Sequence, residues 1–278
     1  MFDVSKYALA SSERLLNMFH EGFNVVDLAQ PLRSLDIGTD IEDAGKLMKK
    51  EGVPVLGIRR SGRIAGYVLP EDLNGDGVLT EFREFNPDQL LDDTSNLEEL
   101  FAPLSEHNFV FIEVVGETVC IVTRDDLEKP PMRMWLFGII TLVEMNVTWA
   151  VEQIYPNGGW KNLISPARLE KARELQFERK RRNQDSTLLS CLQFSDKLNV
   201  LTKEQRNRDI MNLRSRADSR KLIKHLESLR NNLAHSQPVI EDNWKVILEL
   251  SKKIENVVSA PGMRDLVEHV KGETINTE

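Results

Sequence analysis

Residues 53–72 read VPVLGIRRSGRIAGYVLPED, and residues 109–126 read FVFIEVVGETVCIVTRDD. In each stretch two apolar runs flank a short turn that contains glycine. Apolar runs on either side of such a turn are typical of a β-hairpin. Both stretches end at an aspartate, Asp72 in the first and Asp126 in the second. The sequence therefore predicts two copies of one structural unit.

An amphipathic segment precedes each predicted hairpin. Its apolar positions are Ile41, Ala44, Leu47 and Met48 in the first copy, and Leu97, Leu100 and Leu104 in the second. The order helix, strand, turn, strand, helix follows, with strands over 53–58, 64–69, 109–115 and 119–123 and turns at Ser61-Gly62 and Gly116-Glu117. Two such units would each expose one apolar sheet face. We therefore expect them to pack together as a pseudo-symmetric α/β module.

This arrangement resembles the tandem cystathionine beta-synthase (CBS) domain pair over residues 23–127. The family's closing motif is Gly, two hydrophobic residues, Thr or Ser, two variable residues and Asp. It reads GYVLPED at 66–72 and CIVTRDD at 120–126, so each copy departs from the motif once. The resemblance implies that the motif's Asp holds the ribose hydroxyls of an adenine nucleotide, while its Thr contacts phosphate.

Only the second copy has both the threonine and the aspartate, as Thr123 and Asp126. The first copy keeps the carboxylate of Asp72 but has Leu69 in place of the threonine. The resemblance therefore implies one competent cleft, with Thr123 and Asp126 as its main nucleotide contacts, Asp72 as a lesser one, and AMP, ADP or ATP as regulatory ligand. The alternative is a degenerate pair that serves only as a dimerising scaffold.

The linker at 72–83 imitates a calcium-binding loop, with oxygen-bearing side chains at places one, three and five and glycine at place six. Place twelve needs a bidentate carboxylate and holds Arg83 instead. An Asn-Gly-Asp-Gly run is also ordinary turn chemistry. The two cysteines, Cys120 and Cys191, supply neither a disulfide framework nor a zinc cluster, and we expect both to be buried. The sequence predicts no metal site.

From Pro130 onward the pattern predicts helices. Residues 132–154 are apolar nearly all round, with Glu144 as the interior charge, and are expected in a core or a dimer interface. Further helices are predicted over 166–182 (with Ser165 as cap), 187–198, 215–234 and 241–258, together with a turn or two within 203–213. Short connections between amphipathic helices favour an up-down bundle.

The two halves of the chain differ in charge. Up to Tyr155 there are 13 Lys and Arg against 27 Asp and Glu, and from Pro156 onward 23 against 17. Within 161–230 the counts are 18 and 9, and the densest basic run is Arg179-Lys180-Arg181-Arg182. A basic surface attracts polyphosphates, so this run predicts an RNA contact. A solvated helical face is the alternative.

Residues 229–236 read LRNNLAHS and are followed by Pro238. This run resembles the signature of HEPN domains, all-α bundles that include metal-independent ribonucleases and inactive, partner-binding members. The resemblance implies catalytic roles for Arg230, Asn231 and His235, shared across a symmetric dimer. Histidine exchanges protons near neutral pH, and a guanidinium can stabilise the phosphorane formed when the 2′-hydroxyl attacks. The alternative for His235 is a helix-terminal residue that binds the last carbonyl groups.

We expect an α+β protein: an N-terminal tandem CBS pair followed by an all-α HEPN-like helical bundle. The expected boundaries are a helical segment at 1–22, the CBS pair at 23–129 (copies 23–75 and 85–129), a connecting buried helix at 130–156, the bundle at 157–260 and a tail at 261–278. No signal peptide is apparent, and the uncharged stretch 134–143 is too short to cross a bilayer. We therefore expect a cytoplasmic location without membrane contact.

Together these patterns predict an adenine-nucleotide-sensing module that regulates a metal-independent endoribonuclease in a homodimer. The alternative is a non-catalytic switch, in which the bundle docks a protein partner or only dimerises. Motifs of P-loop enzymes, α/β-hydrolases and zinc proteases are absent from the sequence.

Overall fold

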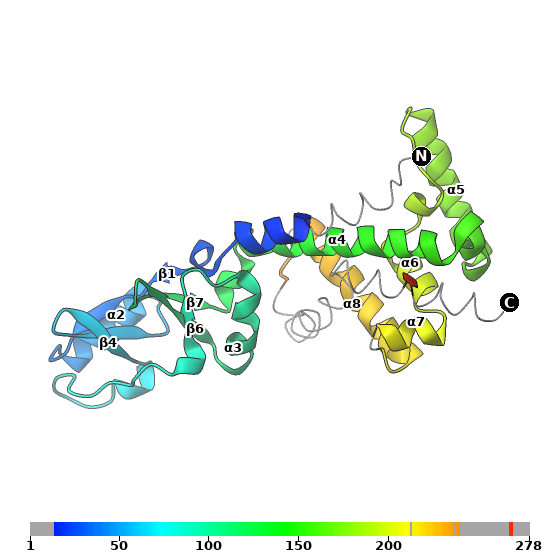
Figure 1. The fold of residues 1–278 in the computed structure, drawn as a ribbon. Helices are drawn as coiled ribbons and strands as arrows, with labels where there is room; N and C mark the ends of the chain where they lie inside the picture. Colours follow the sequence, from blue (N-terminus) through cyan, green and yellow to red (C-terminus); the bar gives the residue numbers. More distant parts are fainter. Residues whose placement is uncertain (1–13, 212, 236, 240–266, 269–278) are drawn as a thin grey trace. The chain divides into compact units, whose positions relative to one another are not determined.

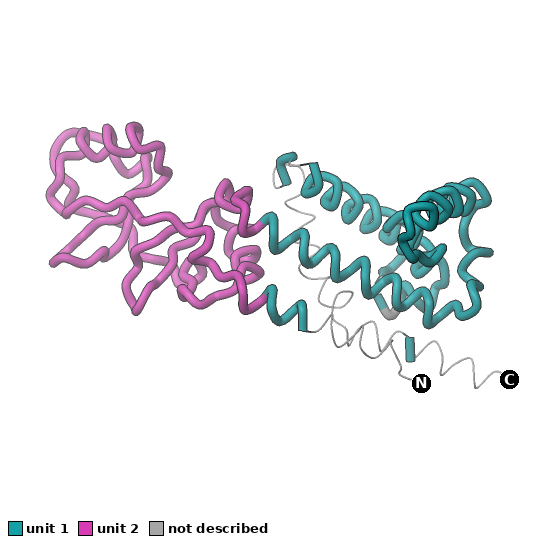
Figure 2. The backbone as a smooth tube through the Cα atoms, turned by 90° about the horizontal axis from the view of Figure 1, so that it is seen from above, with its two compact units in different colours: residues 1–19, 133–278 teal, residues 20–132 magenta. Residues whose placement is uncertain are grey.

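The computed structural model describes residues 14–211, 213–235, 237–239 and 267–268 (Figure 1). The chain divides into two compact units, residues 20–132 and residues 1–19 together with 133–278 (Figure 2). The helix predicted at 241–258 lies outside the described residues.

Two sheets make up the N-terminal unit, residues 20–132. One has the strand order β2-β3-β4 and the other β1-β7-β6-β5. The strands are β1 (Gln30–Pro31), β2 (Ser34–Asp36), β3 (Leu56–Arg60), β4 (Arg63–Val68), β5 (Leu90–Asp92), β6 (Phe109–Val114) and β7 (Glu117–Thr123). Each sheet contains an antiparallel hairpin, β3–β4 or β6–β7, and a parallel strand beside it, β2 or β5. The predicted pair of hairpins is confirmed.

Three details differ from the sequence-based expectation. The second turn is at Val115 and Gly116, which have φ angles of 53° and 75°, rather than at Gly116-Glu117. Strand β3 starts at Leu56 instead of residue 53, in keeping with Pro54, which has no amide hydrogen to donate to a ladder. The parallel strands β2 and β5 were not expected, because three residues are too few to show an alternating pattern.

Helices pack on the sheets as the apolar stripes predict. Helix α2 (Ile41–Glu51) starts at the capping carboxylate of Asp40 and places Ala44 and Met48 in a core with strands β3 and β4. In the second copy the helical segment is divided between η4 (Leu97–Leu100), a 3-10 helix, and α3 (Phe101–Glu106). The remaining 3-10 helices of this unit are η1 (Val25–Asp27), η2 (Pro70–Asp72), η3 (Pro87–Gln89) and η5 (Asp125–Glu128). The closing helix expected in each copy is thus only a short 3-10 turn, η2 or η5.

The other unit is helical throughout its described elements. These are residues 14–22, α4 (Pro130–Ile154, which starts in the N-terminal unit), η6 (Pro156–Leu163), α5 (Pro166–Arg181), η7 (Leu189–Cys191), α6 (Phe194–Leu201), α7 (Gln205–Ile210) and α8 (Arg216–Ala234). Ser165 and Ser215 cap α5 and α8, as their sequences predict. The helix predicted over 187–198 is instead two pieces, because the backbone of Leu192 is extended between η7 and α6.

Helix α4 is buried along most of its circumference. The six apolar residues predicted to face a core are all buried: Leu136, Ile139, Ile140, Val143, Val147 and Val151. A single line along the helix stays exposed, through Met134, Phe137 and Met145. Among the described residues α4 alone is long and apolar enough to cross a membrane, and it is longer than the uncharged stretch 134–143 on which the expectation of no membrane contact rests; 61% of its most apolar window is buried inside the protein.

Candidate functional site

The closing aspartates of the two copies have the same local geometry. The carboxylate of Asp72 accepts a hydrogen bond from the amide of Leu69 at 2.8 Å, and that of Asp126 from the amide of Thr123 at 2.7 Å. Each aspartate thereby closes a tight turn after the hairpin. In both copies this turn positions the residue at the motif's threonine position, which is Leu69 in the first copy and Thr123 in the second.

Asp126 is buried, with 2% of its side chain exposed, and binds several donors. Besides the Thr123 amide, they are the Thr123 hydroxyl at 2.8 Å, the Lys129 ammonium at 2.9 Å and the Gln30 side-chain amide. Burial alone raises the pKa of Asp126, but the hydrogen bonds from Thr123, Lys129 and Gln30 outweigh it and hold the pKa below its usual value. The carboxylate therefore stays ionised inside the fold.

Asp72 binds an arginine instead. Nε and Nη2 of Arg83 donate to its two oxygens at 2.7 and 2.6 Å. The hydrogen bond from Arg83 lowers the pKa of Asp72, and the Leu69 amide adds to this effect against partial burial. Arg83 stands at place twelve of the calcium-like loop. Its guanidinium binds the carboxylate of Asp72, which stands at place one.

Gln30 and Arg83 are equivalent residues in the two copies. Gln30 pairs with Ile121 of β7, and Arg83 pairs with Tyr67 of β4, and both of these partners stand directly after the first motif residue. Each segment that leads into one copy thus crosses to the sheet of the other. There its polar side chain binds the motif aspartate.

The crossing of these segments also explains why the motif of the first copy begins with glycine. A Cβ atom on Gly66 would collide with the carbonyl oxygen of Arg83 and the ring of Phe82, so only glycine fits there. In the second copy Cys120 pairs with Pro31. Cys120 is half-buried, and burial raises the pKa of its thiol, whereas Cys191 is fully buried.

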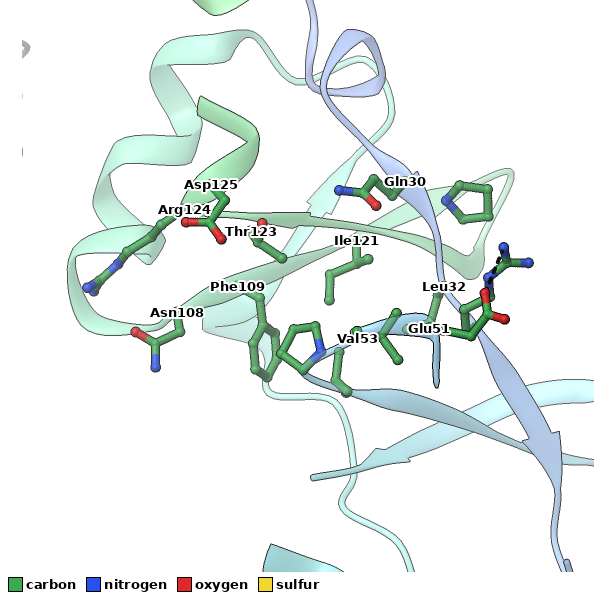
Figure 3. Close-up of a pocket in the computed structure, with 15 residues that line it drawn as sticks. Gln30, Leu32, Glu51, Val53, Asn108, Phe109, Ile121, Thr123, Arg124 and Asp125 are labelled. Atoms are coloured by element: carbon green, nitrogen blue, oxygen red, sulfur yellow. Dashed lines mark ion pairs between the residues drawn. The ribbon is translucent and has the colours of Figure 1, made fainter. Parts of the chain in front are cut away.

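A cavity of about 550 Å³ opens beside the second copy (Figure 3). Residues of both copies line it: Gln30, Pro31, Leu32, Arg33, Glu51, Gly52, Val53, Pro54, Val55, Asn108, Phe109, Ile121, Thr123, Arg124 and Asp125. Its apolar wall comes from buried side chains such as Leu32, Phe109 and Ile121. Its polar groups lie toward the ends of the cavity.

Aromatic side chains stand at the equivalent positions of the first copy. Tyr67 stands where Ile121 does, and Phe85, two residues after Arg83, stands where Leu32 does, two residues after Gln30. The ring of Tyr67 lies 5.9 Å from that of Phe85 and 4.9 Å from that of Phe111. The second copy thus has smaller, aliphatic side chains at both of these positions.

The structure brings part of the predicted nucleotide site to this cavity. Thr123 lines it, while Asp126 and Asp72 do not. The hydroxyl hydrogen of Thr123 is donated to Asp126, which leaves the oxygen lone pairs for a ligand. Arg33 and Glu51 also line the cavity and were missed, because they belong to the first copy and carry no motif.

The predicted catalytic residues lie exposed on the last turns of α8 and at its end. Nε of Arg230 is 3.8 Å from Oε2 of Glu144, whose other oxygen binds the buried Lys197 at 3.0 Å. His235 caps the helix through its backbone amide, which donates to the carbonyl of Asn231 at 3.0 Å. Because α8 stays helical to Ala234, Arg230 and His235 point about 140° apart around it.

A different cation binds the carbonyl groups at the end of α8. The guanidinium of Arg133 donates to the carbonyls of Asn232 and Gln237, at 3.2 and 2.9 Å. This is the role that the alternative interpretation gave to the His235 side chain.

The four residues of the basic run differ in their surroundings. Arg179 is half-buried and donates to the carbonyl of Ser190 at 3.4 Å, while Arg181 pairs with Glu178 at 3.3 Å. Lys180 and Arg182 are exposed. These two therefore leave the most accessible positive charge for an anionic partner.

No group of three or more His, Cys, Asp or Glu side chains in the described part of the chain is arranged to hold a metal ion. The chain matches no model of a protein family and no curated protein.

Solved structures match the N-terminal part, about 40% of the chain, and include CBS-domain proteins. An uncharacterised conserved protein from Pyrococcus horikoshii is 19% identical, with a TM-score of 0.34, covering 38% of this chain and 90% of that one. A conserved CBS-domain protein of unknown function from Thermoplasma acidophilum is 16% identical (TM-score 0.33; 42% and 75% covered). The CBS domain of a bacterial CNNM/CorC-family Mg²⁺ transporter is 14% identical (TM-score 0.33; 47% and 86% covered).

Replacing Asp126 with alanine is expected to lower the free energy of unfolding of the N-terminal unit by about 2–4 kcal/mol, because Lys129, Gln30 and Thr123 lose a buried acceptor. Hydrogen exchange of the β6 and β7 amides in the full chain measures this loss. The exposed neighbour gives the control: Asp125→Ala should leave the same amides unchanged, and equal effects of both variants would contradict the assignment.

The same carboxylate predicts a pH dependence. Because the folded pKa of Asp126 lies below its unfolded value, its contribution to stability is complete above the unfolded value of about 4 and is lost as the pH falls through the folded pKa. Asp126→Asn should flatten this acid limb in the same exchange experiment.

Proposed function

We propose that the N-terminal unit is a CBS-type regulatory module that binds one adenine nucleotide per chain. The observation that carries this proposal is the cavity beside the second copy, where both copies supply walls and the motif residue Thr123 is present. A cavity with apolar walls and a few polar groups is the usual form of a small-molecule site. The larger rings of Tyr67 and Phe85 at the equivalent positions of the first copy support a single site.

The cavity residues suit the parts of a nucleotide. Pro54, Phe109 and Ile121 offer apolar surface for the base. Thr123 and Asp125 offer oxygen acceptors for the hydroxyl groups of a ribose (Figure 3). Asp126 acts behind them, because it holds both Thr123 and Gln30 in place.

Calorimetry on the full chain with AMP, ADP and ATP tests this function directly. We expect adenylate binding with a stoichiometry of one per chain. The absence of any binding at millimolar concentration would reject the sensor function.

As the regulated activity we propose metal-independent cleavage of RNA by the helical unit, in the cytoplasm and in a homodimer. The exposure of Arg230, Asn231 and His235 on one end of α8 supports it, since all three are accessible to a polymer. Proton transfer is assigned to His235 and stabilisation of the phosphorane to Arg230, with Asn231 orienting the ring or the phosphate. Lys180 and Arg182, with Arg179 and Arg181, supply phosphate contacts.

A second candidate is a non-catalytic switch in which the helical unit docks a protein partner. The position of Glu144 beside Arg230 favours it, because Glu144 also binds the buried Lys197 and so presents a carboxylate of the helical core to Arg230. An arginine held this way serves structure and recognition without any chemistry.

The homodimer is expected to use the exposed line of α4, which begins at Met134 and includes Phe137 and Met145. The hydroxyl of Thr141 on the same line donates to the carbonyl of Phe137 at 2.8 Å, so its methyl group remains for packing. Phe137→Glu should convert a dimer into a monomer in light scattering. Phe177→Glu, a change of an even more exposed phenylalanine on α5, should not. A wild-type protein that is monomeric would contradict both the dimer and a catalytic site shared between subunits.

A further inference from the structure

The two arginines at the cavity are held very differently. The Arg124 guanidinium is committed to the end of α3, where Nε donates to the carbonyl of Leu104 at 2.9 Å and Nη2 to that of Ser105 at 3.4 Å. Arg33 instead forms an ion pair with Glu51 at 3.4 Å, with 59% of its side chain exposed (Figure 3). Such a pair is weak, because water screens it. Arg33 can therefore exchange Glu51 for a ligand anion at small cost.

The charge around the cavity is balanced. Its lining includes two cations, Arg33 and Arg124, and two anions, Glu51 and Asp125, so their formal charges sum to zero. The C-terminal end of α2 also borders the cavity, through Glu51 and Gly52, and a helix C-terminus carries partial negative charge. A long chain of phosphate groups would find no further cation in this lining.

We infer that Arg33 is the anion contact of the nucleotide cavity and makes it selective for a ligand with one phosphate over a ligand with three. The inference rests on the proposed nucleotide-binding function. The single phosphate replaces Glu51 as the partner of Arg33. Additional phosphates meet the carboxylates of Glu51 and Asp125, and like charges at close range repel.

Calorimetry with adenosine, AMP and ATP on the full chain separates the contributions. We expect the wild type to bind AMP at least about tenfold more tightly than ATP, because Glu51 and Asp125 repel the additional phosphates of ATP. Arg33→Gln should weaken AMP binding by about tenfold and change adenosine binding by less than about twofold. Glu51→Gln should narrow the difference between AMP and ATP, because it removes the repelling carboxylate.

A matched control uses another exposed Arg–Glu pair of this unit, Arg63 with Glu117 at 3.1 Å, which does not line the cavity. Arg63→Gln should leave all three affinities unchanged. The role of Arg33 would be overturned if Arg33→Gln left the AMP affinity unchanged, or if ATP bound as tightly as AMP. In either case, adenosine binding would still support the sensor function. Failure of the wild type to bind either adenosine or AMP would reject both.

Discussion

Replacing Ile121 with tyrosine should reduce adenylate binding by at least about 100-fold, because the larger ring enters the cavity space. In the first copy a tyrosine, Tyr67, stands at the equivalent position and packs against Phe85 and Phe111. Leu32→Phe should act in the same way from the neighbouring strand segment. Isothermal calorimetry with AMP measures the loss. Undiminished binding in both variants would show that the ligand is bound elsewhere.

The control for these variants is a measurement of their thermal stability. Overfilling a packed site commonly costs about 1–3 kcal/mol, so thermal unfolding must show that the N-terminal unit remains folded. The reverse change in the first copy, Phe85→Leu, removes a ring without altering the lining of the cavity. It should leave AMP affinity unchanged.

His235→Ala should reduce RNA cleavage by a factor of about 10² to 10⁴, the range for loss of a positioned proton donor or acceptor. Total RNA incubated with the full chain, with and without AMP or ATP, provides the assay. Cleavage is expected to persist in EDTA and to leave 2′,3′-cyclic phosphate ends, because the 2′-hydroxyl is the attacking group. Arg230→Ala should cause a comparable loss, since it removes the cation assigned to the phosphorane.

Two further variants make the result specific. His107→Ala, a histidine of the N-terminal unit, should cleave at the wild-type rate. Changing Lys180 and Arg182 to glutamine should weaken RNA binding and flatten its dependence on salt, because fewer counterions are released. A wild type that cleaves no RNA, or a His235→Ala variant as fast as the wild type, would reject the nuclease and leave the docking switch.

Local sequence patterns predicted the elements well where a few neighbouring residues decide the outcome. The hairpins follow from apolar runs around glycine turns, and α5 and α8 start where Ser165 and Ser215 cap them. The burial of α4 follows from apolar residues on nearly every face. The prediction of one continuous helix over 187–198 was wrong, because a single residue with an extended backbone, Leu192, separates two short helical pieces there.

What the sequence alone determined was the repeat and the motif residues Thr123, Asp126 and Asp72. Only the tertiary structure decided which donors hold those aspartates and where a cavity remains. Gln30 reaches Asp126 across 96 positions of the chain, and no local pattern records such a contact. Likewise, the second copy has Leu32 and Ile121 beside its cavity where the first has Phe85 and Tyr67, a difference that has meaning only once the strand pairing makes these residues equivalent.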